Sequence, residues 1–428
     1  MSKNSFSYTA KDFIYGLTGI SSVKMQVERQ DFNVDAPVLR VGILSDTQLP
    51  PEEKKNDGKY RENLRKSFAV LKEQGVHMIL FAGDIGDLGT RYAFHMFNEV
   101  FDEVFGENKP ILQIILGNHD YWMPYGKMRI DFRAAFCDEF GVSPWTHYVV
   151  NGFHFIGASP EDGNMTKGYK KVTALLDEEL KFACEDAPDK PVFVMTHNQP
   201  ENTSYGSEDW GDVTLGEVLS KYPNAVNLSG HVHYSVLDER SIWQGDYTVI
   251  NTQSVSYTEM EVGKVNGTIP PNAEATPMGY ILEISQNECV FKRYNFATGK
   301  EEKSNMRWVL PLPYSKQVFK YTGLRAQNNK PPKMLPHEGE FFKKDGKNFI
   351  RFSAGEHDDF VHSYKLVIDS DKTQLYFSDF YNGIEQMKKE VVLELKDIAS
   401  GKHKIEVFAV DSFGAQSENC AVIENVNI

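Results

Sequence analysis

The sequence has little cysteine, no long apolar run and no excess of positive charge. Its four cysteines are scattered over 428 residues and form no closely spaced metal-binding pair, so we expect reduced, mostly buried thiols. No stretch approaches the roughly 20 apolar residues of a membrane-spanning helix. The first residues lack the apolar core of a signal peptide, which favours a cytoplasmic protein. An extracellular protein stays open if a leader has been removed.

Basic residues are outnumbered by acidic ones. The chain has 46 Lys and Arg against 60 Asp and Glu, for a formal net charge of -14 at pH 7. An acidic surface repels nucleic acids and anionic membranes, so we expect neither as a partner. Bound cations can reverse the charge locally, so a small phosphorylated substrate remains compatible with this balance.

The length and the changes in pattern along the chain predict two domains. Residues 1–38 are interpreted as an N-terminal extension, and strand and helix signals alternate over residues 39–320, which predicts an α/β layered domain. Residues 321–336 contain Asn-Asn-Lys-Pro-Pro and are interpreted as a linker. Residues 337–428 show short strands and turns, which predict a β-sandwich. No feature of that last segment identifies a protein partner.

Apolar periodicity predicts three helices and several late strands within the first domain. The helices are expected at residues 59–74, 90–105 and 169–184. The late strands, at residues 247–251, 279–284 and 289–294, have few helices between them. They therefore predict a second sheet packed on the first.

Five short apolar runs of the first domain end in residues that can bind a metal. These residues are Asp46, Asp84, Asn118 followed by His119, His197, and His231 followed by Val232 and His233. Because each run is typical of a buried strand, we expect the side chains to meet at one edge of one sheet. Carboxylates, an amide and imidazoles suit Mn²⁺, Fe or Zn²⁺ better than Ca²⁺. Paired divalent cations in such sites hydrolyse phosphate esters.

Four motifs in this order resemble the calcineurin-like metallophosphoesterase superfamily. They are Gly83-Asp84-Ile85-Gly86-Asp87, Gly117-Asn118-His119-Asp120, a lone His197 after a strand, and Gly230-His231-Val232-His233. The resemblance covers roughly residues 39–300 and implies a four-layer α/β/β/α core with two divalent metal ions. The last hairpin of the β-sandwich resembles that of a fibronectin type III or Ig-like module.

The resemblance also implies a role for each site residue. Asp84 would bridge the two metals, with Asp46 and His233 on the first metal. The second metal would be held by Asn118, His197 and His231. His119 would be catalytic, protonating the leaving oxygen or stabilising its charge, and Asp87 would orient it. A hydroxide shared by the metals would attack phosphorus.

One position departs from the pattern of the superfamily. Its first motif is usually Asp-x-His, whereas this chain has Asp46-Thr47-Gln48. A glutamine oxygen is a weaker ligand than imidazole, so we expect looser binding of the first metal and favour Mn²⁺, with Mg²⁺, Fe or Zn²⁺ as alternatives. Glutamine here also resembles manganese-dependent ADP-ribose/CDP-alcohol diphosphatases. A supporting or merely structural role for Gln48 stays open.

These observations predict a binuclear-metal phosphohydrolase acting on a small substrate such as a nucleotide. The bond would be a phosphodiester, a pyrophosphate or a phosphomonoester. A phosphoprotein is disfavoured because Leu88, and not arginine, follows Asp87. Two alternatives are a catalytically degraded relative that acts as a binding protein and a metal-dependent nuclease. Tyr121 and Trp122 could stack on a base or sugar of the substrate, or could simply pack on the surface.

Overall fold

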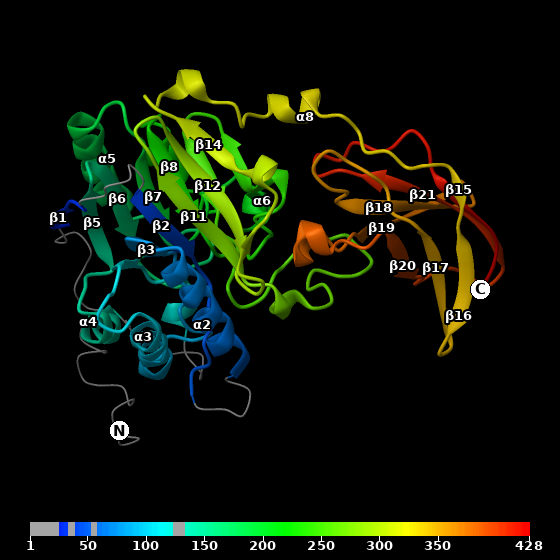
Figure 1. Ribbon diagram of the computed structural model, residues 1–428, viewed down its shortest axis with the longest axis horizontal. Helices are drawn as coiled ribbons and strands as arrows, with labels where there is room; N and C mark the ends of the chain where they lie inside the picture. The colour runs from blue at the N-terminus through cyan, green and yellow to red at the C-terminus, as the bar shows by residue number, and fades with distance from the viewer. Residues whose placement is uncertain (1–24, 33–38, 53–57, 123–132) are drawn as a thin grey trace. The chain divides into compact units, whose positions relative to one another are not determined.

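The computed structural model describes residues 25–32, 39–52, 58–122 and 133–428. Most of the predicted N-terminal extension, residues 1–24 and 33–38, lies outside the described residues. The chain divides into two compact units (Figure 1). The N-terminal unit comprises residues 1–236, 241–258 and 274–323, and the C-terminal unit comprises residues 237–240, 259–273 and 324–428. The C-terminal unit thus takes two short segments from the range predicted for the phosphoesterase domain.

Two sheets form the centre of the N-terminal unit. The first has the strand order β13-β12-β11-β2-β3-β4, and β14 pairs with β12. Its strands are β2 (Leu39–Leu44), β3 (Met78–Phe81), β4 (Ile111–Ile114), β11 (Met278–Ile284), β12 (Glu288–Asn295), β13 (Lys300–Glu301) and β14 (Trp308–Pro311). The strands β2, β3 and β4 are parallel, so their carboxyl ends lie at the same edge.

The second sheet has the strand order β1-β5-β6-β7-β8-β10-β9. Its strands are β1 (Val27–Gln30), β5 (Trp145–Val150), β6 (Phe153–Ala158), β7 (Val192–Thr196), β8 (Ala225–Ser229), β9 (Ile242–Gln244) and β10 (Thr248–Asn251). Here β6, β7, β8 and β10 are parallel to one another. The late strands are therefore divided, because β11 and β12 join the first sheet and β10 joins the second.

The two sheets pack face to face through aromatic side chains. Phe155 and Phe193 of the second sheet stack with ring centroids 5.1 Å apart, and Phe193 meets Phe291 of the first sheet edge-on at 6.3 Å. These rings are buried and form an apolar contact between the sheets, and the buried Gln113 of β4 adds a polar one by donating to the Phe155 carbonyl at 3.0 Å.

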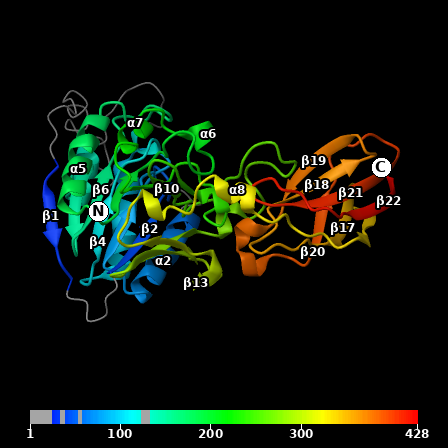
Figure 2. The ribbon, with the colours of Figure 1, turned by 90° about the horizontal axis from the view of Figure 1, so that it is seen from above.

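Helices cover the outer face of each sheet (Figures 1 and 2). The helices of the N-terminal unit are α2 (Gly58–Glu73), α3 (Arg91–Phe105), α4 (Arg133–Phe140), α5 (Thr173–Asp186), α6 (Ser207–Trp210) and α7 (Leu215–Leu219). The side chains of α2, α3 and α4 share a core with β3 and β4, and those of α5 and α7 share a core with β6 and β7. This arrangement confirms the predicted four-layer α/β/β/α core.

The helix α3 shows how local sequence sets an element's ends. The Thr90 side chain accepts a hydrogen bond from the Ala93 amide at 3.2 Å, and Gly106 ends the helix with a positive φ of 61°. The predicted helix at residues 169–184 begins later, at Thr173. Tyr169 instead lies in a preceding turn, where its hydroxyl accepts a hydrogen bond from the His197 amide at 2.6 Å.

The C-terminal unit is a β-sandwich of a five-stranded sheet, β15-β22-β21-β18-β19, and a three-stranded sheet, β16-β17-β20. Its strands are β15 (His337–Glu338), β16 (Glu340–Lys344), β17 (Lys347–Ser353), β18 (Ser363–Ile368), β19 (Lys372–Phe377), β20 (Glu390–Glu394), β21 (Lys402–Val410) and β22 (Ala421–Asn427). One apolar core joins the two sheets. The short helix α8 (Leu324–Asn328) lies in the predicted linker. The fibronectin III-like character of the sandwich stays a prediction.

Candidate metal centre

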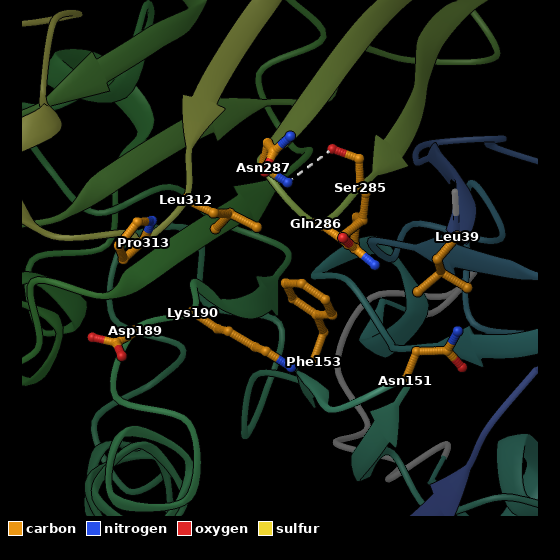
Figure 3. A pocket seen from close by; sticks show the side chains of 11 residues that line it. Leu39, Asn151, Phe153, Asp189, Lys190, Ser285, Gln286, Asn287, Leu312 and Pro313 are labelled. Carbon is orange, nitrogen blue, oxygen red and sulfur yellow. Dashed lines mark hydrogen bonds between the residues drawn. The ribbon is translucent and has the colours of Figure 1, made fainter. Parts of the chain in front are cut away.

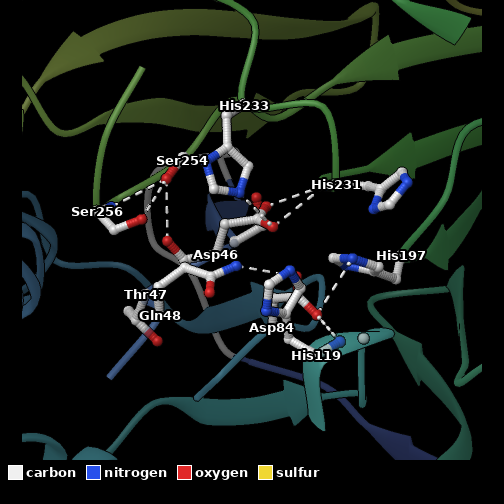
Figure 4. Close-up of polar contacts among 12 residues, drawn as sticks. Asp46, Thr47, Gln48, Asp84, His119, His197, His231, His233, Ser254 and Ser256 are labelled. Carbon is white, nitrogen blue, oxygen red and sulfur yellow. Dashed lines mark hydrogen bonds and ion pairs between the residues drawn. The ribbon is translucent and has the colours of Figure 1, made fainter. Parts of the chain in front are cut away.

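The predicted metal ligands follow strands of two sheets, and the prediction that they share one sheet is wrong. Asp46, Asp84 and Asn118 follow β2, β3 and β4 of the first sheet, whereas His197 and His231 follow β7 and β8 of the second. Both sets of parallel strands end on the same side of the packed sheets, and the side chains meet there (Figure 4). Sequence alone gave no sign of the division, because a buried strand has the same apolar pattern in either sheet.

Five of the predicted ligands have left-handed backbone conformations. The φ angles are positive at Asp46 (57°), Gln48 (48°), Asp84 (54°), His231 (71°) and His233 (56°). Such angles are uncommon outside glycine and cost on the order of 1–3 kcal/mol each. Strain of this kind persists only where the surrounding structure imposes it, and it gathers at functional sites. The backbone here turns sharply at each strand end and directs the side chains toward a shared point.

Two motif glycines leave room for the carboxylates. A Cβ atom on Gly117 would overlap the Asp84 carboxylate, and one on Gly230 would overlap the Asp46 carboxylate. Neither glycine needs a positive φ, so close approach is the reason that each position lacks a side chain.

Asp46 is buried at one side of the cluster. Its Oδ1 lies 3.2 Å from His233 Nε2, and the His231 amide donates a hydrogen bond to its Oδ2 at 3.1 Å. The Asp46 carbonyl accepts hydrogen bonds from the Ser254 hydroxyl at 3.0 Å and the Ser256 amide at 3.1 Å. This serine-containing segment after β10 was missed by sequence reasoning, because it carries no side chain that suggests a metal ligand.

Asp84 occupies the middle of the cluster. Its Oδ2 accepts a hydrogen bond from Gln48 Nε2 at 3.0 Å, and its Oδ1 accepts one from the His119 amide at 2.9 Å. His197 Nε2 lies 3.3 Å from the same Oδ1. Burial acts to raise the pKa of Asp84, but the nearby His197 and His119 outweigh burial and hold it well below its usual value. Asp84 is therefore a buried anion that contacts both halves of the site.

His197 and Asn118 form the other side of the cluster. His197 Nδ1 donates to the Ala82 carbonyl at 2.8 Å, which leaves the lone pair of a neutral ring on Nε2. That atom lies 2.9 Å from Asn118 Oδ1. Two electron-rich atoms at this distance need a proton or a cation between them. Burial opposes a charged ring, but the Asp84 carboxylate outweighs it and raises the pKa of His197 to about 9.

His231 supplies a further nitrogen to the same side. Its ring lies 5.1 Å from the His197 ring, and its Nε2 is buried without a hydrogen-bond partner among the described residues. Burial and the neighbouring His197 hold the pKa of His231 well below its usual value, so the ring is neutral, which is the form that binds metals. The structure thus brings all seven predicted ligands together.

The donor set fits two divalent cations. Ligand atoms of Asp46, Asp84 and His197 all lie within 4.8 Å of one another. Two buried carboxylates, the His197 and Asn118 atoms that face each other and an unpartnered imidazole nitrogen are donors that bound cations would satisfy. Asp84 lies where it can serve both cations.

His119 lies beside the cluster and is not buried within it. Its side chain is 23% exposed, and Nε2 lies 3.9 Å from Asp84 Oδ2. Nδ1 lies 3.0 Å from the carbonyl oxygen of Asp87 and 3.7 Å from its carboxylate. Because a carbonyl can only accept, Nδ1 carries a proton and donates it. Asp87 therefore contacts His119 by a hydrogen bond to its backbone carbonyl, and its carboxylate lies farther from the ring.

Asp120 is a structural carboxylate that sequence reasoning left without a role. It is buried and accepts hydrogen bonds from the amides of Ile85 (3.2 Å), Gly86 (3.0 Å) and Gly117 (2.8 Å). Burial, with a smaller contribution from Asp84, raises its pKa to about 7. It ties the loops after β3 and β4 together. Its place as the last residue of the Gly-Asn-His-Asp motif was the available signal.

Two aromatic residues of the loop after β7 differ in exposure. Trp210 is 41% exposed, and its ring centroid lies 6.5 Å from that of His231. Tyr205 is buried and packs on Tyr234 at 4.6 Å. Trp210 therefore exposes its indole to solvent beside His231, and Tyr205 belongs to a small apolar core.

A cavity of about 780 Å³ lies at the other ends of the strands (Figure 3). It is lined by the beginnings of β2 and β6 and by the turn between β11 and β12, including Leu39, Phe153 and Asn287. None of the predicted site residues lines it. Its walls contain no group of converging ligand atoms comparable to the cluster around Asp84.

Residues 39–235 match the calcineurin-like phosphoesterase family. This range forms a calcineurin-like phosphoesterase domain, and the chain is a metal-dependent phosphoesterase. The family implies two divalent metal ions. No curated protein sequence matches the chain.

Several solved structures are similar at low identity. A dimetal phosphatase from Danio rerio is 12% identical over 61% of this chain and 97% of that chain, with a TM-score of 0.42. The purple acid phosphatase PPD1 from yellow lupin (Lupinus luteus) seeds is 14% identical over 64% of this chain and 53% of that chain, with a TM-score of 0.42. The protein TT1561 of Thermus thermophilus is 13% identical over 63% of this chain and 100% of that chain, with a TM-score of 0.35.

None of the helices in the described ranges has the length and apolar character needed to cross a membrane.

Proposed function

We propose that this protein hydrolyses phosphodiester or pyrophosphate bonds of a small substrate at two divalent cations, with Mn²⁺ favoured. The observation that carries the proposal is the convergence of carboxylate, amide and imidazole donors around the buried Asp84 carboxylate. Bound cations would supply a nucleophile from water at neutral pH and positive charge for the phosphoryl oxygens.

Two groups of side chains would hold the two cations. Asp46 and His233 would bind one, and Gln48 would join them once its side-chain amide, which now donates through Nε2 to Asp84, turns its oxygen toward the cation. The second would be bound by Asn118, His197 and His231. Asp84 would bind both, because its two oxygens contact residues of both sets.

His119 would act on the leaving group. Its Nδ1 is held by the Asp87 carbonyl, so its Nε2 is the nitrogen directed at the site. A proton on Nε2 can pass to the leaving oxygen as the phosphorus–oxygen bond breaks. Partial exposure of the ring is consistent with this role, since the atom must reach a substrate that enters from solvent.

The exposed indole near the site favours a substrate with a flat organic group. Trp210 is 41% exposed and lies beside His231. Indole faces stack on nucleobases and other planar rings. A nucleotide-type phosphoester therefore suits the site better than a simple alkyl phosphate.

Hydrolysis of bis(p-nitrophenyl) phosphate tests the proposal, with p-nitrophenyl phosphate measured in parallel. We expect Mn²⁺-dependent cleavage of the diester that chelator removes and added Mn²⁺ restores. His119→Ala should lower kcat by about 10²-fold for an ester with an alkoxide leaving group and much less for the nitrophenyl ester, whose leaving group needs no proton. His95→Ala is the control, because His95 lies on α3 and pairs with Glu139.

Three results would change the proposal. A strong preference for the monoester would replace the diester substrate with a phosphomonoester. Bound metal without turnover of either compound would support the degraded-enzyme alternative. Equal activity of the His119→Ala and wild-type proteins on every substrate would remove His119 from the mechanism.

A further inference from the structure

The ring of His119 is held by two contacts of different kinds. One is the hydrogen bond from Nδ1 to the Asp87 carbonyl at 3.0 Å. The other is a contact with the Trp122 indole, whose centroid lies 4.0 Å from that of the imidazole at an interplanar angle of 38°. The hydrogen bond fixes one atom of the ring, whereas the indole limits rotation of the ring plane.

Trp122 is itself fixed by two other segments of the chain. Its Nε1 donates to the Gly163 carbonyl at 3.0 Å, and its own carbonyl accepts a hydrogen bond from the Gly89 amide at 3.1 Å. A Cβ atom on Gly163 would lie 2.8 Å from the indole Cδ1 and Nε1 atoms, so that glycine makes room for the ring. The indole is therefore a rigid surface against which His119 rests.

We propose that Trp122 is a positioning residue that holds His119 Nε2 toward the leaving oxygen. This inference rests on the proposed function, because it assigns Trp122 a task only if His119 acts on the leaving group. Without the indole, the partly exposed imidazole could turn about its side-chain bonds while its Nδ1 hydrogen bond stretched or broke. Misplacement of about 1 Å at a reacting atom can lower a rate by roughly 10²-fold.

The step that depends on this position is the transfer of one proton. As the oxygen of a water molecule bonds to phosphorus, the bond from phosphorus to the leaving oxygen breaks, and that oxygen takes the proton from His119 Nε2. The proton released by the attacking water restores His119 after the products leave. An alkoxide needs this proton far more than a nitrophenolate, which is stable as an anion. Loss of position should therefore matter most for esters with poor leaving groups.

The test compares variants of Trp122 in two backgrounds. Trp122→Phe keeps a ring against His119 and loses the Gly163 hydrogen bond, whereas Trp122→Leu loses the ring. Each is made in the wild-type protein and in His119→Ala. Trp145→Leu is the matched control, because its indole donates to the Ser159 carbonyl at 3.0 Å and does not contact His119. Rates are measured on the holoenzyme with p-nitrophenyl and alkyl esters of one phosphate skeleton.

We expect Trp122→Leu to lower kcat about 10-fold for the alkyl ester and about 2-fold for the nitrophenyl ester, with KM little changed. Trp122→Phe should recover most of the loss. In the His119→Ala background the Leu substitution should have almost no further effect, since the residue that it positions is gone. Trp145→Leu should lower the melting temperature without changing the ratio of the two rates.

Other outcomes overturn the inference, and they can be told apart from a failure of the proposed function. A loss that is equal for both esters, or that persists in His119→Ala, would mean that Trp122 acts through general folding of the site. A change in KM confined to aromatic substrates would mean that Trp122 binds substrate and does not position His119. If His119→Ala itself has no effect on the alkyl ester, the proposed role of His119 fails independently of Trp122.

Discussion

Left-handed residues occur in both units, but they differ in type and in burial. In the C-terminal unit they include Asp345, Asp369, Ser370, Asp397 and Asn425, all of which are exposed. In the N-terminal unit, a second set lies in the metal centre, and its members are buried or half-buried. This set consists of Asp46, Gln48, Asp84, His231 and His233.

The difference separates turns from a functional site. Short polar residues such as Asp and Asn tolerate the left-handed region because their side chains bond to the local backbone. Histidine and glutamine in buried positions gain no such local compensation, yet His231, His233 and Gln48 adopt the same region. The strain at these five residues of the N-terminal unit is therefore maintained by the site, and the exposed C-terminal turns carry no comparable cost.

The largest expected effect comes from Asp84, which both halves of the site contact. Asp84→Asn keeps the shape of the side chain and removes its charge. We expect kcat to fall by at least about 10³-fold and bound metal to fall from two ions per chain to one or none. Elemental analysis of the dialysed protein measures the metal.

Asp345→Asn is the control for the Asp84 substitution, because it makes the same chemical change at an exposed left-handed residue of the C-terminal unit. Its activity and metal content should equal those of the wild type. Full activity of Asp84→Asn with two bound metals would remove the distinction between the two sets.

The next effect concerns the space beside Asp46. Gly230→Ala would place a Cβ atom against the Asp46 carboxylate and the Ser45 side chain. We expect about 10²-fold lower kcat and weaker binding of the first metal, because the loop carrying His231 and His233 must move. Metal titration with activity readout checks this. Gly346→Ala is the comparison, since a Cβ atom there meets no neighbour and only its positive φ opposes the change.

A smaller effect is expected from the partly buried carboxylate of Glu261, whose partners Arg240 and His362 belong to the same C-terminal unit. Burial acts to raise the pKa of Glu261, but Arg240 and then His362 outweigh it and lower the pKa to about 2. Since this pKa is depressed in the folded state, the carboxylate stabilises the unit above the ordinary value of about 4.5. That contribution is lost as the pH falls from there toward 2.

Glu261→Gln tests the sign of this contribution. At pH 7 the free energy of unfolding of the variant, measured by urea denaturation, should be about 2 kcal/mol lower than that of the wild type. The difference from the wild type should shrink below pH 4.5, and activity at pH 7 should be unchanged. A difference that grew as the pH fell would contradict the assignment.

The smallest effect is expected at the exposed turn itself. Asp345 and Gly346 connect β16 to β17, and both have positive φ. Asp345→Gly should change stability by no more than about 0.5 kcal/mol, because the relief of strain offsets the added freedom of the unfolded chain. Asp345→Val should cost about 1–2 kcal/mol. Urea denaturation monitored by tryptophan fluorescence distinguishes the two, and equal values would mean that the turn imposes no strain.

Much of the first domain could be predicted from sequence because its signals are local. Apolar periodicity predicted α2 and α3, and each end of these helices agrees with the prediction to within one residue. Runs of Val, Ile and Leu predicted the strands. The division of the strands between two sheets was not predicted, because pairing depends on contacts between residues far apart in the chain. For example, β2 pairs with β11, more than 200 residues later.

The site shows the same limit. Each ligand was predicted from a short motif. The hydrogen bonds that Asp120 accepts from two loops, and those that Ser254 and Ser256 donate to the Asp46 carbonyl, depend instead on neighbours in three dimensions. The contact between His119 and the Asp87 carbonyl was also not predicted, because a motif names a residue and does not say which of its atoms takes part.

We propose that the strained residues around Asp84 hold two cations. The most direct measurement is a crystal structure of the protein grown with Mn²⁺, with anomalous scattering recorded at the manganese edge. We expect two peaks about 3.5–4 Å apart, one on each side of the Asp84 carboxylate, with left-handed backbone retained at the five residues. A single peak, or two peaks that the Asp84 carboxylate does not contact, would contradict it.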